Sequence, residues 1–366
     1  MRINQLKLYN FRNYPELTVD LKNQIIFLEG KNGQGKTNLV EAVSVLALLK
    51  SFRTSNYDLM INSGQENFYL EGSFQSCTAK NINVKLSYKD KKKQIILDGK
   101  KVKKFSEFWG MIPLVSLIPE EGVITSGSPS ERRSFIDQFL SLISPEYFSA
   151  LQNYLSILKQ KNNLLSEIKY NPGNKSLLPV YNLQIVEYAD TIVRLRLKLL
   201  KNYQPIVSEL VTVISPSLKS AELLYSSTIK TDNYKQNLLG RLTENENTEM
   251  RRGVSLFGPH KDDVIFNING YNLRSFGSKG QHKIFLVALK LGQVKFMKSI
   301  IKEYPIFILD DLFSEIDSEK CIKIAELLDS ELQTFITTCD YSKKDYFNKE
   351  VTQIINVENG IFTNVS

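Results

Sequence analysis

Near the start of the chain, the spacing of the apolar residues changes at a glycine. Residues 25–28 form a short apolar run that leads to Gly30, and apolar residues then recur at helical spacing over 39–49. A short continuous run is typical of a buried strand, whereas repeats of three and four residues are typical of a helix. The pattern therefore predicts a strand, a glycine-containing loop and a helix in direct succession.

From residue 68 onward, apolar positions alternate with polar ones. The alternation covers 68–74, 82–88 and 94–97, and an Asp-Gly pair follows at 98–99. Period-two segments bounded by turn residues are typical of hairpin-connected strands. We therefore expect an antiparallel meander in this region.

The middle of the chain is patterned as helices. Helical spacing begins after Ser144-Pro145, which suit an N-cap and a first helical position, and it covers 147–158 and 183–200. These patterns predict a mostly helical inserted domain at 141–250. The polar, weakly patterned end of this insert, 226–252, is expected to be rich in loops.

The final third returns to strands that alternate with helices. Its predicted elements are a helix from about 280, a strand at 306–309, a helix at 322–328 and a strand at 335–338. Such alternation indicates an α/β core. We expect one core, built from residues 1–140 and 251–366, that the helical insert interrupts. The sequence has no internal repeat or sustained heptad array, which argues against long coiled-coil arms.

Length and cysteine content limit the class of protein. A chain of 366 residues is long enough for two or three domains. Its three cysteines are far apart and lack Cys-x-x-Cys spacing, which favours a reducing, cytoplasmic compartment over a disulfide-stapled secreted protein. The most apolar stretch, 40–49, contains Glu41 and is too short to span a bilayer, so we expect no membrane segment.

The chain is basic, with 47 Lys and Arg against 39 Asp and Glu and a net charge of +8. This balance suits a polyanion such as DNA but also occurs in proteins that bind no nucleic acid. Lysines crowd into one stretch, at Lys89, Lys91, Lys92, Lys93, Lys100, Lys101, Lys103 and Lys104. The first four are candidate contacts to DNA phosphates; the alternative is an ordinary solvated face.

The glycine-containing loop carries a full nucleotide-binding pattern. Residues 30–37 read Gly-Lys-Asn-Gly-Gln-Gly-Lys-Thr, which matches G-x-x-x-x-G-K-[ST]. In this pattern backbone N–H groups cradle phosphates, the lysine reaches the β and γ oxygens, and the threonine ligates Mg²⁺. A chance match is the alternative, but a strand before the loop and a helix after it favour ATP binding. The candidate cofactor-binding residues are Gly30, Lys31, Asn32, Gly33, Gln34, Gly35, Lys36, Thr37 and Asn38, and Lys36 is also a catalytic candidate.

Two carboxylates follow the apolar strand predicted at 306–309. Asp310 is expected to hold Mg²⁺, and Asp311 is expected to polarise the attacking water. An apolar strand that ends in acids is common by chance. The motif gains weight because the phosphate-binding loop accompanies it.

A third motif, Gly-Ser-Lys-Gly-Gln at 277–281, stands where a helix is predicted to begin. A serine and glycines at a helix start can form an anion site. That site is redundant with residues 30–37 unless Ser278, Gly280 and Gln281 bind the same nucleotide from a second subunit. The alternative is an ordinary helix N-cap.

In their order along the chain, these segments resemble the RecF family, bacterial recombination mediators with a head of the ATP-binding-cassette type, akin to Rad50 and SMC proteins. The matching segments cover nearly the whole chain and lie at 10–14, 30–38, 51–54, 119–121, 127–133, 159–165, 258–263, 277–283 and 309–317. The resemblance implies an α/β, ABC-type (Rad50/SMC-like) P-loop ATPase head with an antiparallel β lobe and an inserted helical domain.

The resemblance also implies a mechanism and partners. In the family, ATP joins two heads by bridging one subunit's phosphate-binding loop to the other's signature, here residues 278–281, with Asp317 at the interface and Arg12 in a segment near the nucleotide. It implies an ATP-dependent homodimer that binds double-stranded or gapped DNA, cooperates with RecR and RecO, and helps to load RecA at single-strand gaps. ATP hydrolysis would be slow and would act as a release switch.

The chain departs from the cassette pattern at two places. Asp311 stands where a Glu is frequent, and Thr-Thr-Cys-Asp at 337–340 stands where a switch His is frequent. The shorter carboxylate fits a slow switch better than a fast motor. His260 and His282 lack ligand-type neighbours at metal-binding spacing, so we assign neither to a metal.

Two other classes of protein share part of this pattern. The ATPase subunit of a membrane transporter has a phosphate-binding loop and a signature but would copurify with membranes and ignore DNA. A small-molecule kinase has the loop but would transfer phosphate to a metabolite and would need no signature from a second subunit.

Overall fold

The structure is a computed structural model and describes residues 1–168, 172–314, 316–358 and 360–365. The chain divides into two compact units: the first comprises Met1–Gly122, Val213–Pro216 and Leu286–Ser366, and the second comprises Val123–Thr212 and Ser217–Phe285. The predicted insert at 141–250 falls mainly in the second unit, which extends beyond it in both directions. The domain boundaries given above stay a prediction.

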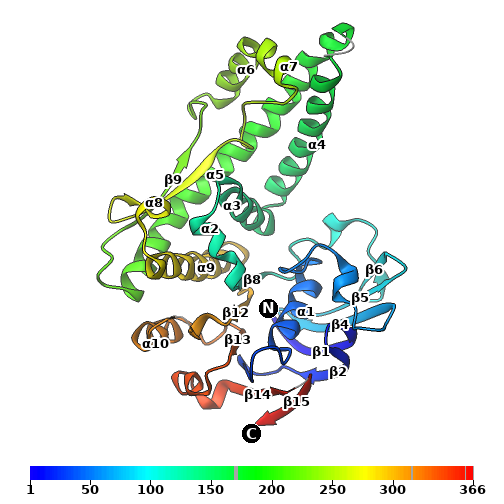
Figure 1. Ribbon diagram of the computed structural model, residues 1–366, viewed down its shortest axis with the longest axis vertical. Coiled ribbons are helices and arrows are strands. Elements are labelled where there is room, and N and C mark those ends of the chain that lie inside the picture. The colour runs from blue at the N-terminus through cyan, green and yellow to red at the C-terminus, as the bar shows by residue number, and fades with distance from the viewer. Residues whose placement is uncertain (169–171, 315, 359, 366) are drawn as a thin grey trace. The chain divides into compact units, whose positions relative to one another are not determined.

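The first unit contains a mixed six-stranded sheet (Figure 1). Its strands in spatial order are β15 (Ile361–Val365), β14 (Thr352–Glu358), β3 (Ile25–Glu29), β13 (Thr334–Thr338), β12 (Ile306–Asp310) and β8 (Leu114–Leu117). All neighbours are parallel except β14 and β15. Strands β3, β12 and β13 are buried along their whole length, as their continuous apolar sequences predict. The expected α/β core is confirmed.

An antiparallel six-stranded sheet accompanies it in the first unit. Its spatial order is β2 (Tyr14–Asp20), β1 (Arg2–Phe11), β4 (Asn67–Gln75), β5 (Asn81–Lys89), β6 (Lys92–Leu97) and β7 (Lys100–Lys101). Burial alternates residue by residue along β4 and β5, so each strand has one buried face. Asp98 and Gly99, both at positive φ, make the tight turn between β6 and β7. The predicted meander is confirmed.

Helix α1 (Lys36–Leu48) is buried almost all round. It follows β3 and contacts strands of both sheets, including β4 and β13. A helix enclosed on all sides is expected to be apolar on all sides, and after its first three residues α1 has only Glu41 and Ser44 as polar residues. Two further helices flank β12 in the chain, α9 (Lys279–Ile301) before it and α10 (Ser318–Glu326) after it; the division between the two units falls within α9.

The second unit is mainly helical. Its helices are α2 (Val123–Ser126), α3 (Pro129–Ile143), α4 (Pro145–Glu167), most of α5 (Leu178–Ile214), α6 (Tyr234–Glu244), α7 (Glu246–Arg252) and α8 (Leu273–Phe276). The Oγ of Ser144 accepts a hydrogen bond from the backbone N of Tyr147 at 3.1 Å, so the predicted N-cap of α4 is confirmed. A small antiparallel sheet, unforeseen from the sequence, joins β9 (Ala221–Ser226), β10 (Asp263–Ile268) and β11 (Tyr271–Asn272).

The expectation of a loop-rich segment at 226–252 is wrong. Most of this segment forms α6 and α7. Tyr234, Leu238 and Leu242 recur at four-residue spacing, and all three side chains are buried. This narrow apolar stripe among many polar residues was the signal for a short amphipathic helix.

A buried ion pair joins α4 to α7 in the second unit. Lys161 Nζ lies 2.6 Å from Glu249 Oε2, and the two side chains are 0% and 2% exposed. Glu249 Oε1 also accepts hydrogen bonds from the Ser255 hydroxyl at 3.1 Å and from the backbone N of Leu256 at 2.8 Å. Burial lowers the pKa of Lys161, and the charge of Glu249 opposes this effect. Each of these buried charges is therefore tolerated only while its partner is present.

We predict that Lys161→Met destabilises the protein by about 3–5 kcal/mol, because it leaves Glu249 charged, buried and without its counter-ion. Lys159→Met, at an exposed position of the same helix, should change the free energy of unfolding by less than about 0.5 kcal/mol. Urea unfolding measures both variants.

The double variant Lys161→Met/Glu249→Leu separates charge burial from packing. Since it removes both charges, it should recover most of the stability that Lys161→Met alone removes. Equal stability of Lys161→Met and Lys159→Met would contradict the importance of this pair.

Candidate nucleotide-binding site

Three neighbouring strands of the mixed sheet bring the site residues together. In the parallel register, Leu28 of β3 lies beside Thr337 of β13, and Thr337 lies beside Asp310 of β12. The carboxyl ends of parallel strands share one edge of a sheet, where ligands of α/β proteins bind. Residues far apart in the chain therefore meet where β3 leads into the glycine loop.

The loop at 30–35 connects β3 to α1 and contains two glycines that combine positive φ with close neighbours. Gly30 has φ +150°, and a Cβ there would collide with the backbone oxygen of Val357. Gly35, at the N-cap of α1, has φ +117°, and a Cβ would lie 2.5 Å from the Tyr14 hydroxyl. Both positions require glycine because of their positive φ and their close neighbours.

Lys36 is held within the loop. Its Nζ donates hydrogen bonds to the carbonyl oxygens of Gly30 at 2.6 Å and Lys31 at 2.9 Å. Burial lowers the pKa of Lys36, while the nearby charges of Asp310 and Asp311 favour its charged form. An ammonium held among inward-facing backbone groups is placed to bind phosphate oxygens.

Thr37 and Asp310 lie in direct contact. The Thr37 hydroxyl is 3.0 Å and 3.1 Å from the two carboxylate oxygens of Asp310, and the Thr337 hydroxyl donates to Asp310 Oδ1 at 2.5 Å. Asp310 is 4% exposed, and burial raises its pKa. A hydroxyl and a carboxylate side by side form a hard-oxygen donor pair of the kind that Mg²⁺ prefers, so these residues fit the expected metal ligands.

Asp311 adopts a backbone conformation that is rare for a residue with a side chain. Its φ is +51°, and its backbone N donates to the carbonyl oxygen of Thr337 at 3.2 Å and to the Thr337 hydroxyl at 3.0 Å. Such local strain is concentrated at functional sites. Its role in polarising water stays a prediction.

Two residues that were assigned no role hold the loop in place. Asn13 Nδ2 donates to the Gln34 carbonyl oxygen at 3.0 Å, and the Tyr14 hydroxyl donates to the Gly35 carbonyl oxygen at 2.8 Å. Asn38 Nδ2 in turn donates to Asn13 Oδ1 at 2.7 Å. The segment at 10–14 is one of those that carry the family resemblance, but the roles of Asn13 and Tyr14 were not predicted. A hydrogen bond between a strand end and a loop 21 residues away leaves no periodic signal in the sequence.

Arg12 precedes Asn13 in the chain, and its side chain is bound to a buried carboxylate. Its Nε and Nη2 donate to the two oxygens of Glu41 at 2.9 Å and 2.6 Å, and its Nη1 donates to the Leu59 carbonyl oxygen at 2.5 Å. Glu41 is fully buried and also accepts from the Ser51 hydroxyl. Arg12 therefore joins the end of β1 to α1 and to the segment at 57–60, and its contact with a nucleotide stays a prediction.

The signature residues belong to the second unit. Ser278 and Gly280 are exposed and Gln281 is half-buried, at the start of α9. The Ser278 hydroxyl accepts from the Gln281 backbone N at 3.3 Å, and Gln281 Oε1 accepts from the Ser278 backbone N at 2.8 Å. This reciprocal pair is a capping box at the start of α9, and the role of these residues in a second subunit's site stays a prediction.

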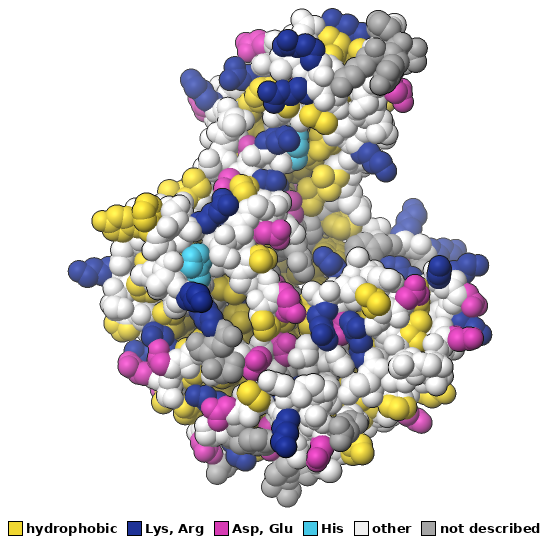
Figure 2. Space-filling view, in the orientation of Figure 1, with side chains coloured by type: hydrophobic (Ala, Val, Ile, Leu, Met, Phe, Trp, Pro, Cys, Tyr) yellow, Lys and Arg dark blue, Asp and Glu magenta, His cyan; other side chains and the backbone are white. Residues whose placement is uncertain are grey.

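The remaining candidates lie on the surface of the first unit. Asp317 caps α10 by accepting from the Lys320 backbone N at 3.0 Å. Lys89, Lys91 and Lys92 are exposed on the hairpin of β5 and β6, and the Lys93 ammonium lies 5.3 Å from the centre of the Tyr57 ring. Figure 2 shows Lys and Arg side chains gathered over this hairpin.

Both histidines have structural contacts. His260 Nδ1 lies 2.5 Å from the Tyr154 hydroxyl, and burial lowers the pKa of His260 to about 4, so the ring is neutral at pH 7. His282 Nδ1 lies 3.0 Å from the Thr125 hydroxyl. Within the part of the chain that the structure describes, no three or more His, Cys, Asp and Glu side chains are grouped so that they could hold a metal ion. In the same part, no helix has the length and apolar character needed to cross a membrane.

The mixed sheet, the glycine loop and the Thr37–Asp310 pair define a P-loop ATPase head of the ABC type. Residues 2–363 match the family model of the RecF/RecN/SMC N terminal domain. The chain belongs to the RecF family of DNA replication and repair proteins. RecF of Staphylococcus epidermidis is 34% identical over 354 residues, which cover 94% of this chain and 95% of the relative; RecF of Bacillus cereus is 32% identical over 367 residues, 98% of each.

Solved structures agree with this assignment. A structure described as the recombination mediator protein RecF with ATP in the RecFOR pathway has a TM-score of 0.89 and 27% identity, and the match covers all of this chain and 97% of the other. An Smc head bound to the C-terminal winged-helix domain of ScpA has a TM-score of 0.62 at 15% identity, which shows a shared fold.

We predict that Asp310→Asn weakens Mg²⁺-dependent ATP binding at least about tenfold, because it removes an anionic ligand. The same change should raise the thermal unfolding midpoint without ligand at pH 8, since burial disfavours the charged form of Asp310. Titration calorimetry and thermal unfolding measure the two effects.

The sign of the pH dependence follows from the raised pKa of Asp310. As pH falls through this raised value, the carboxylate becomes neutral in the wild type, and the stability difference between the two proteins should shrink. Asp345→Asn, at an exposed position, controls for the change in net charge. An Asp310→Asn variant no more stable than wild type at pH 8 would contradict a buried, disfavoured charge.

Proposed function

We propose that this protein is an ATP-dependent DNA-binding switch of recombinational repair. The contact between the Thr37 hydroxyl and the Asp310 carboxylate supports ATP binding most directly, because it pairs the two Mg²⁺ ligands of a P-loop site. The relative solved with ATP, 27% identical over the full chain, supports the same cofactor. Thr37 and Asp310 would hold Mg²⁺, which would supply positive charge to offset that of the phosphates.

ATP is proposed to act as a removable link between two copies of the chain. The loop at 30–37 binds the phosphates in one copy, and Ser278, Gly280 and Gln281 of the other complete the site, with Asp317 at the interface. A ligand that binds only the dimer stabilises it by mass action, and hydrolysis removes that stabilisation. The exposure of Ser278 and Gly280 supports this proposal, since a second copy can reach them.

Hydrolysis is proposed to be slow and to time release from DNA. Asp311 supplies a carboxylate one methylene shorter than Glu, on a backbone fixed by two hydrogen bonds to Thr337. Thr337 also lies where cassette ATPases often carry their switch His, and it contacts Asp310. We propose Thr337 as the residue that senses the state of the metal site.

The partners follow from the family. Relatives at 32–34% identity are named for DNA replication and repair, and the structural relative is described as a recombination mediator in the RecFOR pathway. We propose that this chain binds double-stranded or gapped DNA as an ATP-dependent dimer. We further propose that it acts with RecR and RecO to load RecA at single-strand gaps, in the cytoplasm.

We predict that Ser278→Arg abolishes ATP-driven dimerisation and leaves ATP binding by the monomer within about twofold of wild type. The added side chain would occupy the position proposed for the other copy's phosphates, while residues 30–37 are unchanged. Sedimentation velocity with and without ATP measures dimerisation. Ser226→Arg, at an exposed position of the second unit, is the control; dimerisation that persists in Ser278→Arg would refute the shared site.

We predict that changing Lys91, Lys92 and Lys93 together to Ala weakens duplex DNA binding and flattens its salt dependence. The slope should fall by about one unit for each DNA phosphate that these lysines neutralise in the wild type. Fluorescence anisotropy across a salt series measures the slope. The matched control removes the same charge from three exposed lysines of the second unit, Lys198, Lys201 and Lys230. Equal slopes for the two triple variants would show that the hairpin does not contact DNA.

A further inference from the structure

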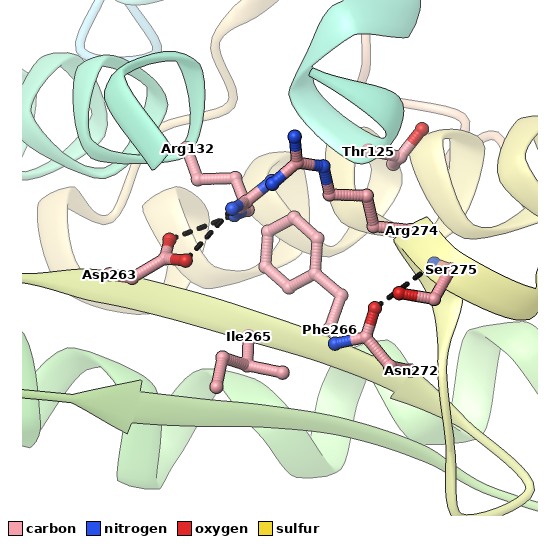
Figure 3. A pocket seen from close by; sticks show the side chains of 8 residues that line it. All are labelled: Thr125, Arg132, Asp263, Ile265, Phe266, Asn272, Arg274 and Ser275. Atoms are coloured by element: carbon pink, nitrogen blue, oxygen red, sulfur yellow. Dashed lines mark hydrogen bonds and ion pairs between the residues drawn. The ribbon is translucent and has the colours of Figure 1, made fainter. Parts of the chain in front are cut away.

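The second unit contains a small polar cavity of about 190 Å³ that none of the roles above uses. Figure 3 shows two arginines among the side chains that line it, Arg132 from α3 and Arg274 from α8, with Asp263 and Phe266 from β10. We call this cavity the arginine pocket. Two positive charges in one small cavity repel each other, so negative charge is needed there to offset them.

One arginine is fixed by its neighbours. Arg132 Nε and Nη2 donate to the two oxygens of Asp263 at 2.9 Å and 2.8 Å, and its Nη1 donates to the Gly127 carbonyl oxygen at 2.9 Å. Asp263 Oδ1 also accepts from the backbone N of Val264 at 2.7 Å. Arg132 is 4% exposed, and three of its five N–H groups make these bonds. The negative charge of Asp263 therefore offsets the positive charge of Arg132 only.

The other arginine has no such partner. Arg274 is exposed, and no carboxylate among the described residues forms an ion pair with it. Figure 3 shows its guanidinium pointing across the pocket toward that of Arg132. One positive charge in the pocket is thus left without a counter-charge.

Neutral donors accompany this charge. Asn272 Oδ1 accepts from the backbone N of Ser275 at 3.1 Å, which fixes its oxygen and leaves its amide N–H groups for a ligand. The Ser275 hydroxyl also lines the pocket, and the buried ring of Phe266 makes part of its wall. An apolar wall strengthens the attraction between a guanidinium and an anion.

We propose that the arginine pocket binds a phosphate group, with Arg274 as its principal ligand. The donors are a guanidinium, an amide and a hydroxyl, and all three come from one short segment of the chain, residues 272–275. A tetrahedral phosphate offers oxygens in several directions, whereas a planar carboxylate uses two. Arginine binds phosphate through paired hydrogen bonds, and the net charge of +8 suits a phosphate-rich partner. The phosphate comes either from a DNA backbone or from a free anion or nucleotide; its assignment to DNA rests on the proposed function.

Inorganic phosphate is the first probe. The measurement uses the full chain carrying Lys36→Ala, so that the loop at 30–37 contributes little, and compares thermal unfolding in phosphate and in chloride at equal ionic strength. Phosphate should raise the midpoint, and Arg274→Ala should weaken its apparent affinity about tenfold. Arg252→Ala, also exposed in the second unit, should leave it unchanged. Arg274→Lys, which keeps the charge but loses the planar fork, should give an intermediate affinity.

Duplex DNA is the second probe, used with Lys36 intact. If the pocket holds a backbone phosphate, Arg274→Ala should lower the salt slope of DNA binding by about one unit relative to Arg252→Ala. An unchanged slope, together with weaker stabilisation by phosphate, assigns the pocket to a free phosphate or a nucleotide. Equal phosphate stabilisation in Arg274→Ala and Arg252→Ala overturns the proposal, and this result is independent of ATP and DNA. Because Arg274 is exposed, its replacement should leave the unliganded unfolding midpoint unchanged, which checks folding.

Discussion

The hydrogen bond between Thr37 and Asp310 is the constraint on which the arrangement of the first unit depends. It joins residues 273 positions apart, at 3.0 Å. It requires that β3, β13 and β12 lie side by side, in parallel, with their carboxyl ends level. It also requires that α1 begin directly after the glycine loop, so that Thr37 in its first turn faces the end of β12.

The mixed sheet also accommodates a long excursion of the chain between two neighbouring strands. Leu117 of β8 pairs with Leu309 of β12 as its parallel neighbour. The second unit starts at Val123, soon after β8, and its last residue, Phe285, lies in the helix that precedes β12. The excursion therefore leaves from one strand and returns to the adjacent one. Near its two ends, the Thr125 hydroxyl lies 3.0 Å from His282 Nδ1. Because the ends are close together, the entropic cost of the excursion grows only slowly with the residues inserted.

The sequence predicted much of this fold and site, for a physical reason. Buried parallel strands, glycine loops and meander strands carry local periodic signals, so β3, β12, β13 and the residues at 30–37 were recognisable. Helix α6 was missed because its apolar stripe is narrow, and α7 was missed because the one residue that it buries is Glu249. Asn13, Tyr14 and Thr337 were missed as site residues because each acts through a hydrogen bond to a distant segment, and such pairs leave no period in the sequence.

The signature at the start of α9 shows that a structural role and a binding role are compatible in the same atoms. In the capping box, the Ser278 hydroxyl oxygen accepts a hydrogen bond, so its own O–H group can still donate. Gln281 likewise accepts through Oε1, which leaves its amide N–H groups as donors. An anion that approaches this end of α9 would therefore find donors without breaking the cap. The cap holds both side chains in one geometry before any ligand arrives, which lowers the ordering cost of binding. The capping bonds are therefore the same whether or not the serine also binds a ligand, and only a ligand or a second copy of the chain distinguishes the two roles.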